Sequence, residues 1–208
     1  MVRVSYWDHR KPVRRERAVD IDAAAQAAVD LLDSGGLRAL TLRAVANRLE
    51  VAPPSLYSRV ESVDDLFDLA LDRALGCDPE LTRTVDEAGI EELVLSYYRH
   101  VLRHRWVCHV IAMRAPRGPH YLRLSERLCT LLVDSGVAAP LSAAYALSNF
   151  AIGSAATAPV AGSEHHAPVD PASAPTYARL HRRQRHADAE RTVREGIAAL
   201  AAHFGARG

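Results

Sequence analysis

Apolar residues return at three- and four-residue steps along most of this chain, and this spacing constrains the fold more than any other feature. Ile21, Ala24 and Ala28, for example, are followed by Leu31 and Leu32. Residues three and four apart lie on one face of an α-helix, so the pattern predicts amphipathic helices. No segment shows the alternation of Val, Ile and Thr that predicts a β-strand. The chain is therefore expected to be all-α.

Short helices are predicted in the first part of the chain. Asp20 or Asp22 can cap a helix that ends at 34–36, and Thr41 caps a second helix that ends at 50–52. A third begins at 53–55, where proline is tolerated in the first turn. A fourth runs from about Ser62 to Gly76, with an acidic start that the helix dipole favours. The second and third helices together form a helix-turn-helix.

The rest of the chain is also helical wherever its periodicity can be read. The predicted helices, separated by Pro, Gly and Asp, are 90–105, 106–114, 119–135, 140–158 and 176–204, the last with a break around 186–188. Residues 160–175, rich in Ala, Pro, Ser and His, are expected to be a loop. We therefore expect a basic, mobile arm at 1–18, a three-helix DNA-binding domain at 19–62 and a larger helical domain at 63–208.

Charge is balanced over the chain but clustered at its start. Lys and Arg number 26 against 25 Asp and Glu, so binding to a polyanion must depend on local clusters. The basic residues of the arm are Arg3, Arg10, Lys11, Arg14, Arg15 and Arg17, against only Asp8 and Glu16. Such an arm can follow a DNA backbone or enter the minor groove, or it can be a solvated tail.

Several features predict a cytoplasmic protein that does not enter a membrane. The cysteines, Cys77, Cys108 and Cys129, have no metal or redox spacing and cannot all pair, which predicts a reducing compartment. The N-terminus lacks the apolar segment of a secretory signal. The charge-free stretch 135–163 is long enough to cross a bilayer, but it is rich in Ala and interrupted by proline and polar residues. A helix buried by protein, within a domain or between subunits, explains it better.

The histidines do not form a catalytic or metal-binding motif. His100 and His104 have a helical spacing that can bind zinc, but a catalytic site would also need a third ligand and a glutamate base. No Ser-His-Asp arrangement, glycine-rich phosphate loop or pair of carboxylates in a helical cleft is present. No cofactor, metal site or enzyme activity is predicted.

A series of short motifs fills the segment 22–75. They are 28–32 with the glycines at 35–36, Leu-Thr-Leu-Arg-Ala-Val-Ala at 40–46, Leu-Glu-Val at 49–51 and Pro-Ser-Leu-Tyr-Ser-Arg-Val at 54–60, followed by Leu66. In order and spacing the segment resembles the DNA-binding domain of TetR-family transcriptional repressors, and the motif at 54–60 is its most specific part. The resemblance implies a homodimer that binds a double-stranded DNA operator and a small-molecule effector.

Candidate DNA-binding residues lie on the second and third helices. A recognition helix needs short or flat side chains near its N-terminus so that its backbone can approach base edges, and Pro53, Pro54 and Ser55 are of this kind. The resemblance implies that Thr41 and Arg59 hold phosphates, that Arg43 reaches a base edge, and that Tyr57 and Ser58 touch backbone or base. Among these residues Arg43 alone can contact guanine bidentately. Tyr57 could instead belong partly to the core, and Arg43 could be a solvated charge.

Two positions depart from the family pattern. The turn position usually held by glycine is Glu50, where a left-handed backbone would cost about 1 kcal/mol. The lysine usual at the start of the fourth helix is replaced by Val63, so one phosphate contact is missing and carboxylates are expected near the DNA. We therefore expect the affinity for DNA to depend on the basic arm at 1–18.

The larger domain is expected to hold the dimer interface and the effector pocket. For the dimer we predict the helices 140–158 and 188–204, through Ala143, Ala144, Leu147, Ala151 and Ala155, and through Ile197, Leu200, Ala201 and Phe204. For the pocket, placed between helices, we predict Tyr97, Trp106, His109, Met113, Leu128 and Asn149. Asn149 is included because an amide in an uncharged helix needs a partner. Each of the six is also a candidate core or dimer residue.

The sequence thus predicts a homodimeric, ligand-responsive transcriptional regulator, a repressor released from a palindromic operator when its effector binds. Two other functions stay open. A ligand-independent DNA-binding factor would keep the DNA-binding half and lack the effector. An all-α enzyme or small-molecule-binding module would carry an incidental helix-turn-helix.

Overall fold

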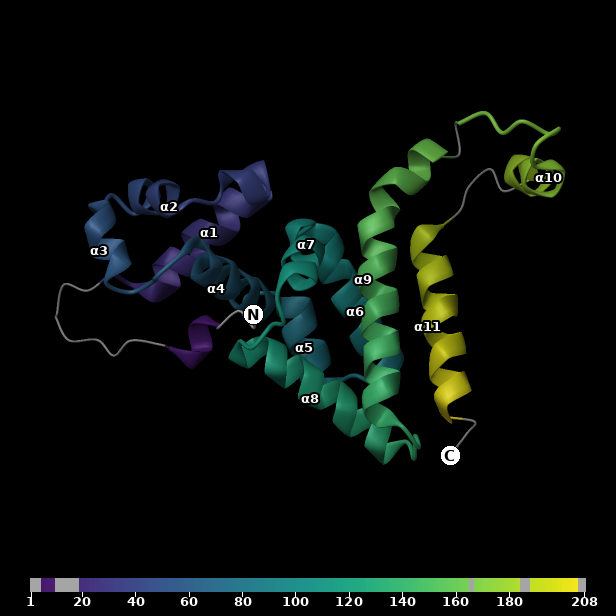
Figure 1. Cartoon of the computed structure of the whole chain (residues 1–208). Helices are drawn as coiled ribbons and strands as arrows, with labels where there is room; N and C mark the ends of the chain where they lie inside the picture. The colour runs from purple at the N-terminus through teal and green to yellow at the C-terminus, as the bar shows by residue number, and fades with distance from the viewer. Residues whose placement is uncertain (1–4, 10–18, 165–166, 184–187, 206–208) are drawn as a thin grey trace.

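The computed structural model describes residues 5–9, 19–164, 167–183 and 188–205, and all regular structure in these ranges is helical (Figure 1). The α-helices are α1 (Ile21–Gly35), α2 (Leu42–Arg48), α3 (Pro53–Tyr57), α4 (Val63–Gly76), α5 (Pro79–Glu87), α6 (Ile90–Arg103), α7 (Trp106–Met113), α8 (Pro119–Asp134), α9 (Pro140–Glu164), α10 (Pro175–Arg183) and α11 (Ala189–Gly205). Two 3-10 helices are η1 (Tyr6–Asp8) and η2 (Leu37–Ala39). The all-α prediction is confirmed.

Side-chain caps begin the helices of the N-terminal part. Asp20, rather than Asp22, caps α1 by accepting the Asp22 backbone N–H at 2.9 Å. Thr41 caps α2 by accepting the Ala44 N–H at 3.0 Å, and Ser62 caps α4 by accepting the Asp64 N–H at 3.2 Å. Each cap satisfies a backbone donor that has no partner inside the helix.

Helix α5 was not predicted, although the chain carries a local signal for it. Asp78 accepts the backbone N–H groups of Glu80 and Leu81, both at 3.1 Å, and Pro79 occupies the first helical position. An acidic cap followed by proline is a typical helix start. The helix is short, so its apolar residues recur too few times to predict a helix from their spacing.

Helix α9 is longer than predicted and continues through Pro159 to Glu164. The expected loop therefore begins later than residue 160. An internal proline removes one helical hydrogen bond and kinks the axis without always ending the helix, and Figure 1 shows α9 bending near its C-terminal end. The predicted break at 186–188 falls largely outside the described residues.

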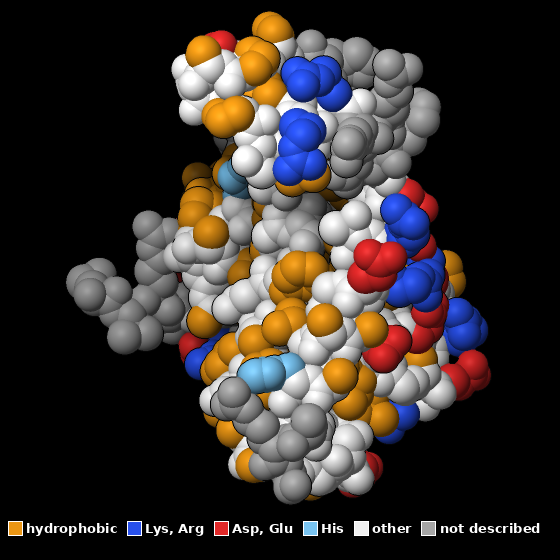
Figure 2. All heavy atoms as spheres, turned by 90° about the vertical axis from the view of Figure 1, so that its right-hand side faces the viewer, with side chains coloured by type: hydrophobic (Ala, Val, Ile, Leu, Met, Phe, Trp, Pro, Cys, Tyr) orange, Lys and Arg blue, Asp and Glu red, His pale blue; other side chains and the backbone are white. Residues whose placement is uncertain are grey.

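The predicted dimer stripe of α9 is instead part of the core of the single chain. Ala143, Leu147 and Ala151 are fully buried, because α9 packs against α6, α8 and α11. Ala144, Ala155 and Ile197 are buried as well, whereas Leu200, Ala201 and Phe204 keep partial exposure. Because α9 carries no charge on any face before Glu164, its composition could not distinguish the inner face from the outer one. Hydrophobic side chains also cover the side of the molecule near α10 and α11 (Figure 2).

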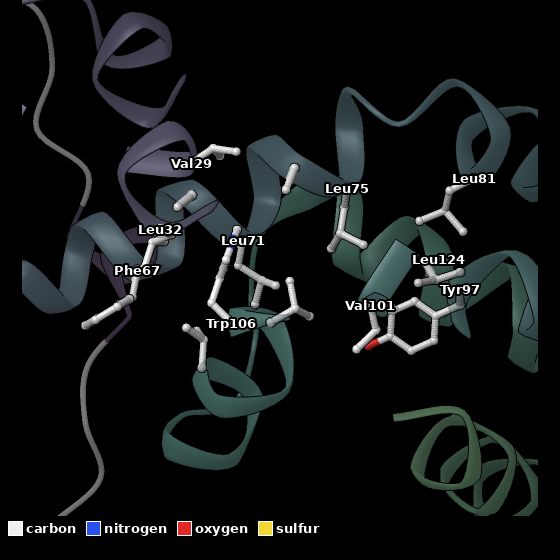
Figure 3. Close-up of a cluster of buried hydrophobic side chains, with 14 of the residues drawn as sticks. Val29, Leu32, Phe67, Leu71, Leu75, Leu81, Tyr97, Val101, Trp106 and Leu124 are labelled. Carbon is white, nitrogen blue, oxygen red and sulfur yellow. The ribbon is translucent and has the colours of Figure 1, made fainter. Parts of the chain in front are cut away.

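A single hydrophobic core runs from the helix-turn-helix part into the larger domain through α4. Figure 3 shows Leu32 of α1 near Phe67 and Leu71 of α4, and Leu75 of α4 near the α6 and α8 residues Tyr97 and Leu124. Helix α4 packs on α1 and also on α5, α7 and α8. The helix that follows the helix-turn-helix is therefore shared by both parts.

The beginning of the chain differs from the arm that we expected. Residues 5–9 form η1 on α4, with Tyr6 buried. The Ser5 hydroxyl and the Tyr6 backbone N–H both donate to Asp68 at 2.9 Å. An aromatic ring that can be buried on α4 explains why this stretch is ordered despite its lack of periodicity. The basic residues of the arm lie at 1–4 and 10–18, outside the described residues.

None of the helices in the described ranges is both long and apolar enough to span a bilayer.

Candidate nucleic-acid interface and ligand cavity

Helices α2 and α3 are anchored by apolar residues and present their polar residues to solvent. Val45, Ala46 and Leu56 are completely buried in the hydrophobic core, where α2 packs against α1 and α3. The predicted contact residues that are exposed are Thr41, Arg43, Pro53, Pro54, Ser55, Tyr57 and Ser58, and Arg59 is partly buried. Tyr57 is 53% exposed to solvent, so it is not a core residue of the single chain.

The turn between α2 and α3 has the backbone that its family pattern implies. Glu50 has a φ of 55°, in the left-handed region that favours glycine. The Val51 N–H donates to the Ala46 carbonyl at 3.0 Å, and the Glu50 N–H donates to the Asn47 carbonyl at 3.2 Å. These two bonds make a Schellman motif that ends α2 and redirects the chain into α3.

Local hydrogen bonds also fix the ends of the two helices. The Thr41 hydroxyl oxygen accepts the Ala44 N–H at the exposed start of α2, and the hydroxyl can still donate its own hydrogen. Ser58 donates to the Ser55 carbonyl at 2.7 Å. Such a helix pair offers hydroxyls, an Arg and a phenol to one surface, the groups that contact phosphates and base edges.

The carboxylates at the start of α4 are held by other segments of the chain. Arg114 pairs with Asp64 at 3.0 Å and with Asp68 at 2.7 Å. Asp65 is buried, accepts the Glu61 N–H at 2.6 Å and lies 3.0 Å from His9 Nε2. These partners neutralise part of the negative charge that we expected near the DNA. No local sequence pattern predicted them.

A small cavity lies between α6, α8 and α9. It has a volume of about 20 Å³ and is lined by Leu93, Val94, Tyr97, Tyr121, Leu124, Ser125, Leu128 and Ser148. Tyr97 is 4% exposed, and its buried hydroxyl has no hydrogen-bond partner among the described residues. Burial, with a smaller effect of nearby Tyr121, raises the pKa of Tyr97 above its ordinary value, so the phenol stays protonated.

Two larger clefts, each of about 530 Å³, lie between the helix-turn-helix part and the larger domain. Asp33 of α1 and Arg103 line both. The Trp106 indole N–H donates to Asp33 at 2.7 Å, and His104 Nδ1 lies 2.8 Å from the same oxygen. Asp33 therefore ties α1 to the α6–α7 corner with a cleft on either side.

Four of the six predicted pocket residues line these sites. Tyr97 and Leu128 line the cavity, and Trp106 and His109 line one of the clefts. Met113 is 43% exposed, and Asn149 is exposed on the outer face of α9; neither lines the cavity or the two clefts described here. The amide of Asn149 can therefore be hydrated in the single chain, which removes the reason for placing it in a pocket. The sequence did not identify Tyr121, whose ring also lines the cavity.

His100 on α6 and His104 at the C-cap of this helix contact two different aspartates. His100 is fully buried with its Nδ1 2.8 Å from Asp78, whereas His104 contacts Asp33. Burial lowers the pKa of His100 although the bond to Asp78 opposes it. Burial also acts to raise the pKa of Asp78, but bonds from His100 and Arg103 outweigh it and hold that pKa below its ordinary value. No group of three or more metal-ligating side chains occurs within the described ranges.

The architecture defines a class of protein: a helix-turn-helix domain that shares one helix with a larger helical domain containing a cavity. Residues 25–70 match the family model "Bacterial regulatory proteins, tetR family", and residues 84–203 match "Tetracyclin repressor-like, C-terminal domain". The chain belongs to the TetR family of bacterial regulatory proteins.

Relatives of known name agree with this assignment. An HTH-type transcriptional regulator of Saccharopolyspora erythraea is 34% identical, over 69% of this chain and 63% of its own. The HTH-type transcriptional repressor DrrR1 of Streptomyces coeruleorubidus is 31% identical, over 72% of this chain and 58% of its own. The chain thus matches about three fifths of the length of these relatives. The TetR-family protein ActR of Streptomyces coelicolor, in complex with actinorhodin, is 26% identical with a TM-score of 0.74, over 92% of this chain and 98% of that one.

Proposed function

We propose that this protein is a DNA-binding transcriptional regulator, a cytoplasmic repressor that leaves a palindromic operator when a small molecule binds its larger domain. The observation that carries the proposal is the α2–α3 surface. Its apolar residues are buried and its hydroxyl, aromatic and basic residues are exposed, on the motif that matches the family. A regulator needs no catalytic group, and neither of the named relatives is described as an enzyme.

In the proposed complex the α3 N-terminus enters the major groove. Pro53, Pro54 and Ser55 let the backbone approach the bases, and Arg43 contacts guanine. The hydroxyls of Thr41 and Ser58, the Tyr57 phenol and Arg59 contact the DNA backbone or bases. The basic residues at 10–18 would add phosphate contacts, because they follow η1, which is fixed on α4.

The proposed homodimer uses the outer faces of α9 and α11. Leu141 and Tyr145 are 58% and 63% exposed in the single chain, and they share an outer face with Asn149 at successive four-residue steps. Large exposed apolar side chains on one helix favour association. Asn149, which we expected in the effector pocket, would then lie at the interface, together with the partly exposed Phe204 of α11.

The proposed effector site is the cavity between α6, α8 and α9. Helix α8 connects this cavity with α4, because Asp72 of α4 accepts the backbone N–H groups of His120 at 2.8 Å and Tyr121 at 3.2 Å. The Tyr121 ring lines the cavity while its backbone is bound to α4. A ligand that displaces α8 would move α4 and the helix-turn-helix with it, provided that it binds one of the two arrangements more tightly.

A gel shift with DNA from beside the protein's own gene tests the proposed function. The wild-type chain should retard this DNA in the presence of excess scrambled competitor. Arg43→Ala should weaken specific binding by about 1–3 kcal/mol. Arg83→Ala, which removes the same charge from the exposed face of α5, should bind like wild type. Equal binding to specific and scrambled DNA would contradict the proposal.

A further inference from the structure

The hydroxyl of Tyr97, a residue that lines the cavity, is a buried donor without a hydrogen-bond partner among the described residues, and it can donate to a ligand. A buried hydroxyl without a hydrogen bond costs free energy, and most such groups in proteins have a partner. Tyr97 lies on α6 with its ring near Leu124 and Val101 (Figure 3), and no described residue reaches its oxygen. The neighbouring Ser125 hydroxyl donates to the Tyr121 carbonyl at 3.0 Å and makes no hydrogen bond with Tyr97.

The walls of the cavity restrict the charge of that ligand. Four of its lining residues are aliphatic, namely Leu93, Val94, Leu124 and Leu128, and the polar ones are tyrosines and serines. No described residue that lines it carries a charge at neutral pH. An ionised ligand would lose its hydration here without gaining a counter-charge, so burying it would be unfavourable.

The size of the cavity shows what must change when a ligand enters. Its volume of about 20 Å³ holds one water molecule, whereas sites for drug-sized ligands occupy about 300–1,000 Å³. A ligand must therefore separate α8 from α6 and α9. A flat ring demands the least separation, and the rings of Tyr97 and Tyr121 offer it aromatic contacts.

We propose that the cavity binds an uncharged, mainly apolar aromatic compound that places a carbonyl or hydroxyl oxygen against the Tyr97 hydroxyl. The inference rests on the proposed function, because it names the chemical class of the effector. A protonated phenol is a good hydrogen-bond donor, so a carbonyl oxygen is the best match.

Three naphthalenes of similar shape test the proposal by titration calorimetry on the full chain. 2-Acetylnaphthalene carries an uncharged acceptor, 2-ethylnaphthalene carries none, and 2-naphthoate is an anion. The acetyl compound should bind about tenfold more tightly than the ethyl compound, the scale of one buried hydrogen bond. The anion should bind more weakly than the acetyl compound. Tyr97→Phe should remove the advantage of the acetyl group and leave affinity for the ethyl compound unchanged.

Tyr98→Phe is the matched control, because Tyr98 is the next residue on α6, is buried and does not line the cavity. It should keep the preference for the acetyl compound. Tighter binding of 2-naphthoate, an unchanged preference in Tyr97→Phe, or no binding of any probe would overturn the proposal. A gel shift on the same preparations distinguishes failure of this proposal from failure of the proposed function. If the protein still binds DNA in any of these cases, only the proposed class of effector is wrong, and the proposed regulator function stands.

Discussion

At the scale of single residues, three buried carboxylates on α4 hold separate segments of the chain. Asp65 binds the turn before α4 and lies beside His9, Asp68 binds the N-terminal segment and Arg114, and Asp72 binds the first turn of α8. The sequence predicted an acidic helix start but not these roles. Except for the Glu61 N–H, their partners lie tens of residues away along the chain, and no spacing rule connects such positions.

Glu50 is the residue whose strain was correctly predicted, because the family that the sequence resembles usually has glycine at this turn position. Glu50→Gly should raise the free energy of unfolding by about 0.5–1 kcal/mol, since a side chain at positive φ is strained. Urea denaturation measures the change. Glu50→Ala keeps the Cβ atom and should give no such gain; an equal gain in both variants would show that the glutamate side chain, and not the backbone, is responsible.

His100 should make the protein sensitive to mild acid. Its pKa in the folded chain lies below its ordinary value of 6.5, mainly because of burial, so the unfolded chain binds the proton more readily. Stability should therefore fall as the pH drops from about 6.5 through the lower folded pKa. The pKa of Asp78 is lowered from 3.8, so its contribution is lost only in stronger acid.

His100→Gln tests this expectation because glutamine cannot titrate and can still donate to Asp78. Thermal unfolding between about pH 7.5 and 5 should show a steeper loss of stability in wild type than in the variant. Parallel curves for the two proteins would mean that His100 does not carry the acid sensitivity.

At the scale of helices, close packing joins α9 to α11. Gly196 of α11 faces the Phe150 ring of α9 so closely that an added Cβ atom would overlap it. Helix periodicity predicted both helices but not how they pack. An uncharged helix such as α9 has two apolar faces, and only the positions of α6, α8 and α11 decide which one is buried.

Gly196→Ala should destabilise the chain by about 1–3 kcal/mol, because a methyl group is forced against Phe150. Chemical denaturation of the single variants and of Gly196→Ala/Phe150→Leu forms a double-mutant cycle. The smaller leucine should recover part of the loss. Additive effects in the double variant would show that the two residues are not coupled.

At the scale of the whole molecule, α4 joins the proposed DNA-binding surface to a domain with a cavity. The DNA-binding motif was recognisable from the sequence because its contacts are local and its spacing is fixed by two short helices and a turn. The cavity was predicted only through Tyr97 and Leu128, since its walls come from three helices that are distant in sequence. The clefts beside Asp33 depend on the orientation of the helix-turn-helix part relative to the larger domain. The spacing of apolar residues along the chain does not predict this orientation.

The central claim is that the α2–α3 surface reads a two-fold symmetric DNA sequence. Selection of bound sequences from a random DNA pool, by the full chain at about physiological salt, tests it most directly. The account predicts an inverted repeat with half-site centres about one helical turn apart, or a multiple of it. Arg43→Ala should relax the same base pair in both halves. A pool that stays random, or that converges on a single asymmetric site, would contradict the account.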